Sequence, residues 1–290
     1  MERRYGYERV DTCEEAVTLL SEGGMESRLL AGGTDLLVEV HKDGASWDRL
    51  IDVSRVAAIR NITEEVGAII VGAAVTHTEI ASSDLIREQL PALAEASASI
   101  GSPQIRNRGT VGGNIANAAA CADTLPALVC LGAVARIVTP EGETEIGVGD
   151  LVTGVNRTTM PAAGIIRDFR IPKPADGTEM AFVKLGRRQA QSISRLSLAC
   201  MGRLDAEGKV ADLRVTPGAC TSQTQRFDAA ETILLGQTPT EELVQKAGAA
   251  AAAQMVEIAG RRWSTAYKEP ALTALVERGL RQVLGIAEVK

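Results

Sequence analysis

The sequence has few aromatic residues and no pair of closely spaced cysteines. Its 290 residues include three Phe, three Tyr and two Trp, so any ring-shaped ligand would find few aromatic stacking partners. The five cysteines are odd in number and show no C-x-x-C spacing, so the sequence indicates neither a disulfide framework nor a self-contained zinc or iron–sulfur site. We therefore expect no metal in this chain and buried thiols that pack as small hydrophobic groups. The cysteines are Cys13, Cys121, Cys130, Cys200 and Cys220.

Long apolar runs and blocks of like charge are also missing. No stretch approaches the roughly 20 apolar residues that span a bilayer, and the start, Met1–Tyr5, lacks the apolar core of a signal peptide. The net charge of −6 is spread along the chain, and no basic stripe interleaved with aromatic residues indicates a nucleic-acid partner. These absences predict a folded cytoplasmic protein whose partner is a small molecule or another protein.

Side chains that usually carry catalysis are scarce. His41 and His77 are far apart and lie in no metal-like spacing, so we assign them structural or surface roles. The sequence contains no Ser-His-Asp set and no paired carboxylates at a useful spacing, so we expect no catalytic residue. Any chemistry must then belong to a bound cofactor.

The chain is long enough for two domains, and proline and glycine are densest at residues 171–177. Before this boundary the pattern predicts a helix at 12–20, a strand at 27–31, a short helix at 34–41 and a strand at 50–53. A hairpin at 59–75, a helix at 86–99, a structured loop at 101–123, a helix at 125–131, a hairpin at 134–148 and a helical turn at 149–153 follow. Beyond the boundary we expect strands at 181–185, 194–204 and 210–219, then helices at 240–259 and 269–284. The prediction is an α+β chain that ends in a β-meander with helices.

The first glycine-rich loop follows the predicted strand at 27–31 and has the sequence Leu30-Ala31-Gly32-Gly33-Thr34-Asp35-Leu36. Glycines after a strand allow backbone amides to turn inward, and with a helix N-terminus they form a site for pyrophosphate oxygens. A tight strand-to-helix turn that needs a positive φ explains the same residues equally well.

The second glycine-rich loop, Thr110–Asn117, is more distinctive and is followed by Asp123. Two such loops in one domain suit a dinucleotide with two phosphates and a ribityl chain. Neither loop has the spacing of a Rossmann fingerprint or of a P-loop, which disfavours an ordinary NAD fold and an NTPase. Taken alone, Asp123 is more simply the cap of a helix that starts near Thr124.

These segments resemble the FAD-binding subunit of molybdenum hydroxylases, a family that includes xanthine dehydrogenase, carbon monoxide dehydrogenase and nicotinate dehydrogenase. The resemblance covers nearly the whole chain, and the second loop is its specific part. It is carried by Ala31–Asp35, by Gly101–Asn107 leading into Thr110–Asn114, by Asp123, by Phe182–Arg188 and by Trp263–Lys268.

The resemblance implies an FAD-binding domain of the PCMH type, similar to vanillyl-alcohol oxidase, over residues 1–175, with two α/β lobes at about 1–55 and 56–175. A smaller α+β domain of the CO dehydrogenase flavoprotein type would span residues 176–290. The residues that it assigns to FAD are Leu30, Ala31, Gly32, Gly33, Thr34, Asp35, Leu36, Ile100, Thr110, Gly112, Gly113, Asn114, Asn117, Asp123, Ile166 and Lys184.

The resemblance also implies the function of an oxidoreductase subunit, similar to xanthine dehydrogenase and of class EC 1.17.1. It would work in a hetero-oligomer with a molybdenum-cofactor subunit and a [2Fe-2S] subunit, and pass electrons from their clusters through FAD to NAD⁺ or another acceptor. FAD would be held non-covalently, because neither glycine loop contains a histidine. Lys184 near the pyrimidine side of the ring would favour an anionic reduced flavin. Ile100 stands where animal xanthine dehydrogenases have an aromatic residue, which leaves the acceptor open.

Alternatives remain at this point. The chain can be a stand-alone flavin oxidoreductase of the same fold, or a non-catalytic binding subunit that has lost its flavin. Cys121 is read as a packed thiol in preference to a redox thiol. Arg187 and Arg188 can bind the electron acceptor or simply form a solvated turn, and the sequence favours neither.

Overall fold

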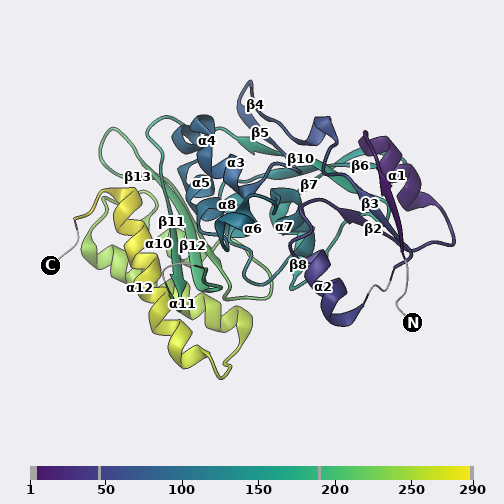
Figure 1. Cartoon of the computed structure of the whole chain (residues 1–290). Helices are drawn as coiled ribbons and strands as arrows, with labels where there is room; N and C mark the ends of the chain where they lie inside the picture. Colours follow the sequence, from purple (N-terminus) through teal and green to yellow (C-terminus); the bar gives the residue numbers. More distant parts are fainter. Residues whose placement is uncertain (1–4, 45–46, 189–190, 288–290) are drawn as a thin grey trace.

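The structure is a computed structural model that describes residues 5–44, 47–188 and 191–287 (Figure 1). It contains three main sheets and one two-stranded ribbon, mixed with helices throughout, which confirms the predicted α+β class. The residues before Tyr5, on which the expectation about a signal peptide rests, lie outside the described residues. Among the described helices, none is both long and apolar enough to cross a membrane.

The first sheet is parallel and carries the first glycine loop at its carboxyl edge. Its strands run in the order β1 (Gly6–Arg9), β3 (Arg49–Asp52) and β2 (Ser27–Leu30). Helix α1 (Cys13–Ser21) begins after Thr12, whose hydroxyl accepts the Glu15 N–H, and α2 (Leu36–Asp43) connects β2 to β3. The predicted β-loop-α-β unit is confirmed, and β1 is an addition that the sequence did not predict.

The second sheet is antiparallel and has an unpredicted strand at its centre. Its order is β4 (Ile62–Glu65), β5 (Ala68–Gly72), β10 (Ile165–Pro172), β6 (Val134–Thr139) and β7 (Gly142–Gly147). The two predicted hairpins, β4–β5 and β6–β7, are confirmed. Strand β10 lies between them and buries Phe169 completely. The two hairpins therefore become one sheet only through β10.

Short helices fill the space beside this sheet, and two sequence predictions fail here. The predicted helix at 86–99 is two helices, because Pro91 lacks a backbone N–H and starts a new one. The predicted loop at 101–123 contains two helices, whose first turns are capped by the hydroxyls of Ser102 and Thr110. The elements are α3 (His77–Ser82), α4 (Asp84–Gln89), α5 (Pro91–Ala98), α6 (Pro103–Arg106), α7 (Val111–Asn117), α8 (Thr124–Cys130), α9 (Val148–Leu151), β8 (Val152–Gly154) and β9 (Arg157–Thr158).

The third sheet is the predicted antiparallel meander of β11 (Glu179–Gly186), β12 (Ser194–Leu204) and β13 (Val210–Gly218). Three helices follow it. Helix α10 (Asp228–Leu234) was not predicted, α11 (Glu241–Ala259) was, and α12 (Thr265–Leu284) starts one turn earlier than expected and runs through Pro270.

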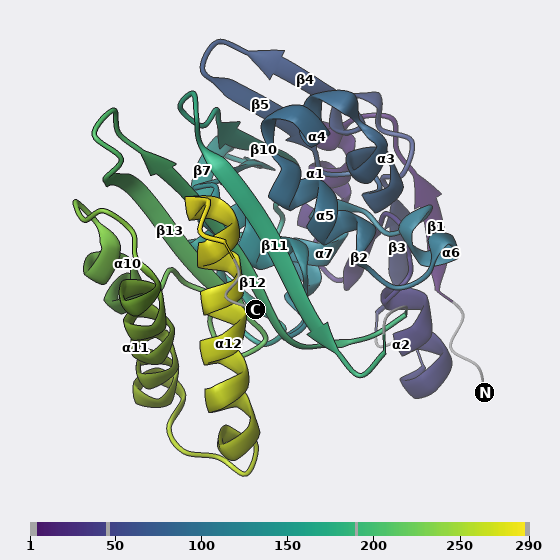
Figure 2. The same cartoon turned by 90° about the vertical axis from the view of Figure 1, so that its left-hand side faces the viewer.

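The third sheet is covered on both faces, with α11 and α12 on one side (Figure 2). Alternation along β12 makes this possible. Leu198 and Cys200 face α12, where a Cβ on Gly279 would lie 2.6 Å from the Leu198 side chain, whereas Ala199 and Met201 join the core of the second sheet. Helices α5 and α8 contact the same sheet. The meander is thereby fixed against the part of the chain that carries the second glycine loop.

Candidate cofactor-binding site

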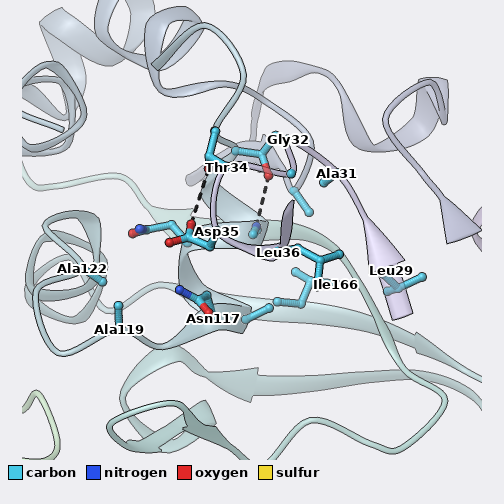
Figure 3. Close-up of a pocket in the computed structure, with 18 of the residues that line it drawn as sticks. Leu29, Ala31, Gly32, Thr34, Asp35, Leu36, Asn117, Ala119, Ala122 and Ile166 are labelled. Atoms are coloured by element: carbon cyan, nitrogen blue, oxygen red, sulfur yellow. Dashed lines mark hydrogen bonds between the residues drawn. The ribbon is translucent and has the colours of Figure 1, made fainter. Parts of the chain in front are cut away.

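A cavity of about 940 Å³ collects the residues that the sequence had singled out. It is lined by the first glycine loop, the start of α7, the segment around Asp123, strand β10 and strand β11. In Figure 3, Asp35 faces Asn117, and Ile166 lies beside Leu36. Their roles in binding remain predictions. The cavity brings together every predicted site residue: Leu30, Ala31, Gly32, Gly33, Thr34, Asp35, Leu36, Ile100, Thr110, Gly112, Gly113, Asn114, Asn117, Asp123, Ile166 and Lys184.

The first glycine loop offers free backbone donors to this cavity. Gly33 has φ +72°, so the turn does need a residue that tolerates a positive φ, as the simpler interpretation held. Helix α2 begins directly after Asp35, which makes no side-chain hydrogen bond to cap it. Within the described part of the chain, the N–H groups of residues 32 to 35 have no hydrogen-bond partner. These donors, together with the positive end of the α2 dipole, suit an anion.

The two glycine loops touch each other at Gly32. A Cβ at this position would lie 2.0 Å from the carbonyl oxygen of Arg108 and 3.0 Å from the Cα of Gly109. A side chain at this position would force the backbone to shift, so glycine is what permits the two backbones to approach so closely. Gly32 therefore holds the first loop against the segment that leads into the second.

The second glycine loop, in contrast, uses its backbone donors inside the protein. The Val111 N–H donates to the Val75 carbonyl at 3.0 Å, and the Gly112 N–H donates to the Ala73 carbonyl at 2.8 Å. The Gly113 N–H donates to the Thr110 hydroxyl oxygen at 3.1 Å. This loop can contribute side chains to a ligand, but the N–H groups of Val111, Gly112 and Gly113 are already bonded.

Asn114 illustrates the side-chain contribution of the second loop. Its Oδ1 accepts a hydrogen bond from the Thr124 hydroxyl at 2.6 Å, which orients the amide and leaves its NH₂ group as the free donor. Helix α7 ends at Asn117 and is followed by its C-cap Ala118, which has φ 49° and whose carbonyl accepts the Asn156 N–H at 2.8 Å. The polar side chains of α7 are thus held at the cavity wall.

Asp123 and Lys184 form a buried ion pair that joins the start of α8 to β11. Lys184 Nζ lies 2.6 Å from Asp123 Oδ2 and 3.0 Å from the Ser99 carbonyl oxygen, and the Asp123 side chain is 5% exposed. Asp123 occupies the N-cap position of α8, as the simpler interpretation held, but its side chain makes no cap bond and accepts a hydrogen bond from the Ser194 hydroxyl instead. Burial raises the pKa of the Asp123 carboxyl, and the Lys184 ammonium opposes that shift.

Family models match both halves of the chain. Residues 3–174 match the FAD binding domain in molybdopterin dehydrogenase, and residues 181–283 match the CO dehydrogenase flavoprotein C-terminal domain. The chain belongs to this family of FAD-binding subunits. The resemblance inferred from the glycine loops is therefore confirmed.

Relatives cover most or nearly all of this FAD-binding chain. It is 30% identical over 280 residues to the 6-hydroxypseudooxynicotine dehydrogenase complex subunit alpha of Paenarthrobacter nicotinovorans, covering 97% of this chain and 94% of that one. It is 33% identical over 227 residues to the xanthine dehydrogenase FAD-binding subunit of Escherichia coli O157:H7, covering 78% and 77%. A solved carbon monoxide dehydrogenase chain from Hydrogenophaga pseudoflava matches with a TM-score of 0.91 and 30% identity, covering 98% and 99%.

The residues present fit FAD. The cavity volume lies at the upper end of the usual range for ligand pockets, about 300–1,000 Å³, as a large dinucleotide requires. The unbonded amides and uncapped helix of the first loop suit the diphosphate, and the side chains of Asn114 and Asn117 suit hydroxyl groups. Among the described lining residues no Phe, Tyr or Trp occurs, so the flavin ring would pack against aliphatic side chains such as Ile100 and Ile166.

The structure also places Cys121, Arg187 and Arg188, which are not among the predicted FAD-binding residues. Cys121 lines the cavity, and burial raises its thiol pKa, which supports the packed-thiol interpretation. Arg187 and Arg188 are exposed at the end of β11, and the Arg188 guanidinium donates to the Gln191 carbonyl oxygen. Within the described residues, no group of three or more His, Cys, Asp or Glu is placed to hold a metal ion.

His77 lies at this site although it is not among the predicted site residues. Its side chain is buried, which excludes the surface role and agrees with the structural one, and it also lines the cavity. A signal was present in the sequence: Thr76 and Glu79 form a capping box, which fixes His77 as the first residue of α3. The spacing Thr-x-x-Glu could have located the helix start, though not the cavity beside it.

Proposed function

We propose that this chain holds FAD in the cavity and serves as the electron-transfer subunit of a molybdenum-containing hydroxylase or dehydrogenase. The observation that carries the proposal is the convergence of both glycine loops and the Asp123–Lys184 pair on one cavity of FAD size, in a chain of this family. FAD, when bound, exchanges electrons both singly and in pairs, which suits a link between one-electron and two-electron carriers.

The residues of the chain would bind and orient the cofactor. The free amides of Gly32 to Asp35 would hold the diphosphate, and Asn114 would donate from its NH₂ group to the ribityl hydroxyls. Lys184 would place a positive charge near the flavin ring while Asp123 and the Ser99 carbonyl hold its ammonium in place. Ile100 and Ile166 would exclude water from the ring face.

The electron path and the domain boundary belong to the same proposal. The curated relatives are named as subunits or chains of dehydrogenases of xanthine, carbon monoxide and 6-hydroxypseudooxynicotine, which supports a hetero-oligomer with a molybdenum-cofactor subunit and a [2Fe-2S] subunit. We propose that electrons pass from those partners through FAD to NAD⁺ or another acceptor, with xanthine dehydrogenase chemistry of class EC 1.17.1 as one candidate. A boundary near residue 175 is supported by the two matched ranges.

Absorption spectroscopy of the purified chain tests the proposal. We expect a flavin spectrum, release of FAD on denaturation and no flavin attached to the denatured polypeptide. Bleaching of the spectrum on addition of NADH would support NAD⁺ as the acceptor, whereas a stable spectrum with NADH would direct the search to another acceptor. A chain that stays colourless after incubation with FAD would overturn the proposal.

A further inference from the structure

The imidazole of His77 is a buried polar group with an unsatisfied atom. The residue is 2% exposed, and its Nδ1 is enclosed without a hydrogen-bond partner among the described residues. Because buried polar side-chain atoms are nearly always bonded, each exception needs a physical explanation. The unsatisfied Nδ1 shows that hydrogen bonding inside the protein does not account for this histidine.

His77 lies where the two glycine loops meet. Its N–H donates to the Gly109 carbonyl oxygen at 3.0 Å, next to the point where Gly32 contacts the same segment. A Cβ on Gly109 would lie 3.3 Å from His77 Cδ2 and 3.4 Å from Thr34 Oγ1. The imidazole and the Thr34 hydroxyl therefore flank the same small gap at the cavity wall.

The protonation state follows from this environment. Burial, and after it the positive charge of Arg106, lowers the pKa of the His77 imidazole to about 4, so the ring is neutral near pH 7. A neutral imidazole has one N–H donor and one acceptor nitrogen. Since Nδ1 is enclosed, the nitrogen that can serve a ligand is Nε2.

We propose that His77 is a further FAD-binding residue, whose Nε2–H donates a hydrogen bond to the diphosphate at the junction of the two glycine loops. In the second loop the N–H groups of Val111, Gly112 and Gly113 are bonded internally and do not serve the ligand. The first loop presents its free amides to the cavity, and His77 lines the same cavity beside Gly109 and Thr34, so its Nε2–H would add a side-chain donor there. This role rests on the proposed binding of FAD.

Apoprotein titrated with FAD tests this role through flavin fluorescence. We expect His77→Leu to raise the Kd for FAD at least about tenfold, as expected for loss of a hydrogen bond to a charged group. His77→Gln retains an N–H donor at a similar reach and should restore most of the affinity. The matched control is Ser97→Ala, because Ser97 Oγ is also buried and unpartnered but is not part of the cavity lining, and its Kd should not change.

The unfolding temperature of each apoprotein separates this role from a structural one. Since the Nδ1 of His77 has no partner, His77→Leu should leave the unfolding temperature of the apoprotein unchanged or raise it. A purely structural histidine would lower the unfolding temperature and affect FAD binding only in proportion.

NMR of ¹⁵N-histidine-labelled protein gives a direct readout, because His41 and His77 are the two histidines of the chain. The ring resonances of His77 should move on addition of FAD or ADP and stay in place with riboflavin, which lacks phosphate. Unchanged His77 resonances together with a normal Kd for His77→Leu would overturn the role of His77 while FAD binding stands. Failure of the wild-type chain to bind FAD would overturn both.

Discussion

The loop at residues 30–36 and the loop at residues 110–117 each contain two adjacent glycines beside a helix start, yet they use their backbone donors in different ways. In the first loop the amides of residues 32 to 35 are unbonded within the described chain, and α2 has no side-chain cap. In the second loop the amides are bonded to residues 73 and 75 and to the Thr110 hydroxyl. One loop is open toward a ligand, and the other is closed against the protein.

Two similar glycine motifs in one site can therefore have different functions: the first loop is free to bind the ligand, and the second stabilises the cavity wall. Gly112 is buried and lets α7 pack directly on the backbone of Ala73, which fixes the cavity wall. Gly32 is half-buried and brings the open loop against that wall. Substitutions that act on stability in one loop and on FAD affinity in the other would test this division.

The largest effect is expected for Gly112→Ala. Its Cβ would lie 2.6 Å from the Ala73 Cβ and 2.7 Å from the Ala73 carbonyl oxygen, and backbone at this position cannot easily move. We expect the free energy of unfolding of the apoprotein to fall by about 3 kcal/mol, the upper end for overpacking a core. Urea denaturation of the wild-type and variant apoproteins measures this change in the free energy of unfolding.

Gly23→Ala is the matched control for that substitution. Nothing lies within 4 Å of a Cβ at Gly23, so its free energy of unfolding should change by less than about 0.5 kcal/mol. Equal effects of the two alanines would mean that the second loop does not support the cavity wall.

The next largest effect is a loss of apoprotein stability at acid pH. It depends on His77, which lies at the junction of the two loops. Because the folded pKa of His77 is lowered to about 4 from 6.5, the unfolded state binds the proton more readily between these values, and stability falls as the pH falls. From pH 7 to pH 5 this contribution amounts to roughly 2 kcal/mol.

The difference in stability between wild type and His77→Gln, measured by urea denaturation at several pH values, isolates this contribution. The pH dependence of wild type should be steeper than that of the variant. Parallel curves would show that the imidazole is not held neutral beside the loops.

Much of the fold could be predicted from the sequence, because hydrophobic alternation, turn residues and helix caps mark most of its strands and helices. The meander β11–β13 and helix α11 follow clear alternation, turn and capping signals, and their observed bounds lie within about two residues of the prediction. Strand β10 was missed because it pairs with hairpins that lie far from it along the chain. Helix α7 was missed because its glycine-rich composition resembles a loop, and α6 was missed because it is only four residues long; hydroxyl caps from Thr110 and Ser102 start the two helices.

The candidate site could be predicted as a set of residues but not as a hydrogen-bonding pattern. The family resemblance supplied the residues that line the cavity, including Ile166 on the unpredicted strand β10. No local signal could reveal that the amides of Val111 and Gly112 are taken up by residues of another segment. The burial of His77 also depends on that long-range packing, so spacing along the chain could not disclose it.

Gly32→Ala tests whether a substitution in the first loop lowers FAD affinity more than it lowers stability. A Cβ 2.0 Å from the Arg108 carbonyl oxygen would push the two loops apart, while the half-buried position leaves room for the exposed segment around Arg108 to move. We expect the Kd for FAD to rise at least about tenfold, equivalent to about 1.4 kcal/mol, with a smaller loss of stability than for Gly112→Ala. Fluorescence titration and urea denaturation of the same samples measure both. A loss of stability larger than that of Gly112→Ala would contradict the division between the loops.

The smallest effects are expected for Thr110→Val and Thr34→Val. These two substitutions should separate an effect on stability from an effect on FAD affinity. Thr110→Val removes the hydroxyl that accepts the Gly113 N–H, so it should lower the free energy of unfolding by about 1 kcal/mol, as loss of a helix cap does. The hydroxyl of Thr34 bonds only weakly to Asp35, at 3.4 Å, so Thr34→Val should leave stability unchanged. Its Kd for FAD should rise by about fivefold, because that hydroxyl is free to donate to a phosphate. If Thr34→Val destabilises the apoprotein as much as Thr110→Val and leaves the Kd unchanged, both loops are supports, and the open loop has no special part in binding.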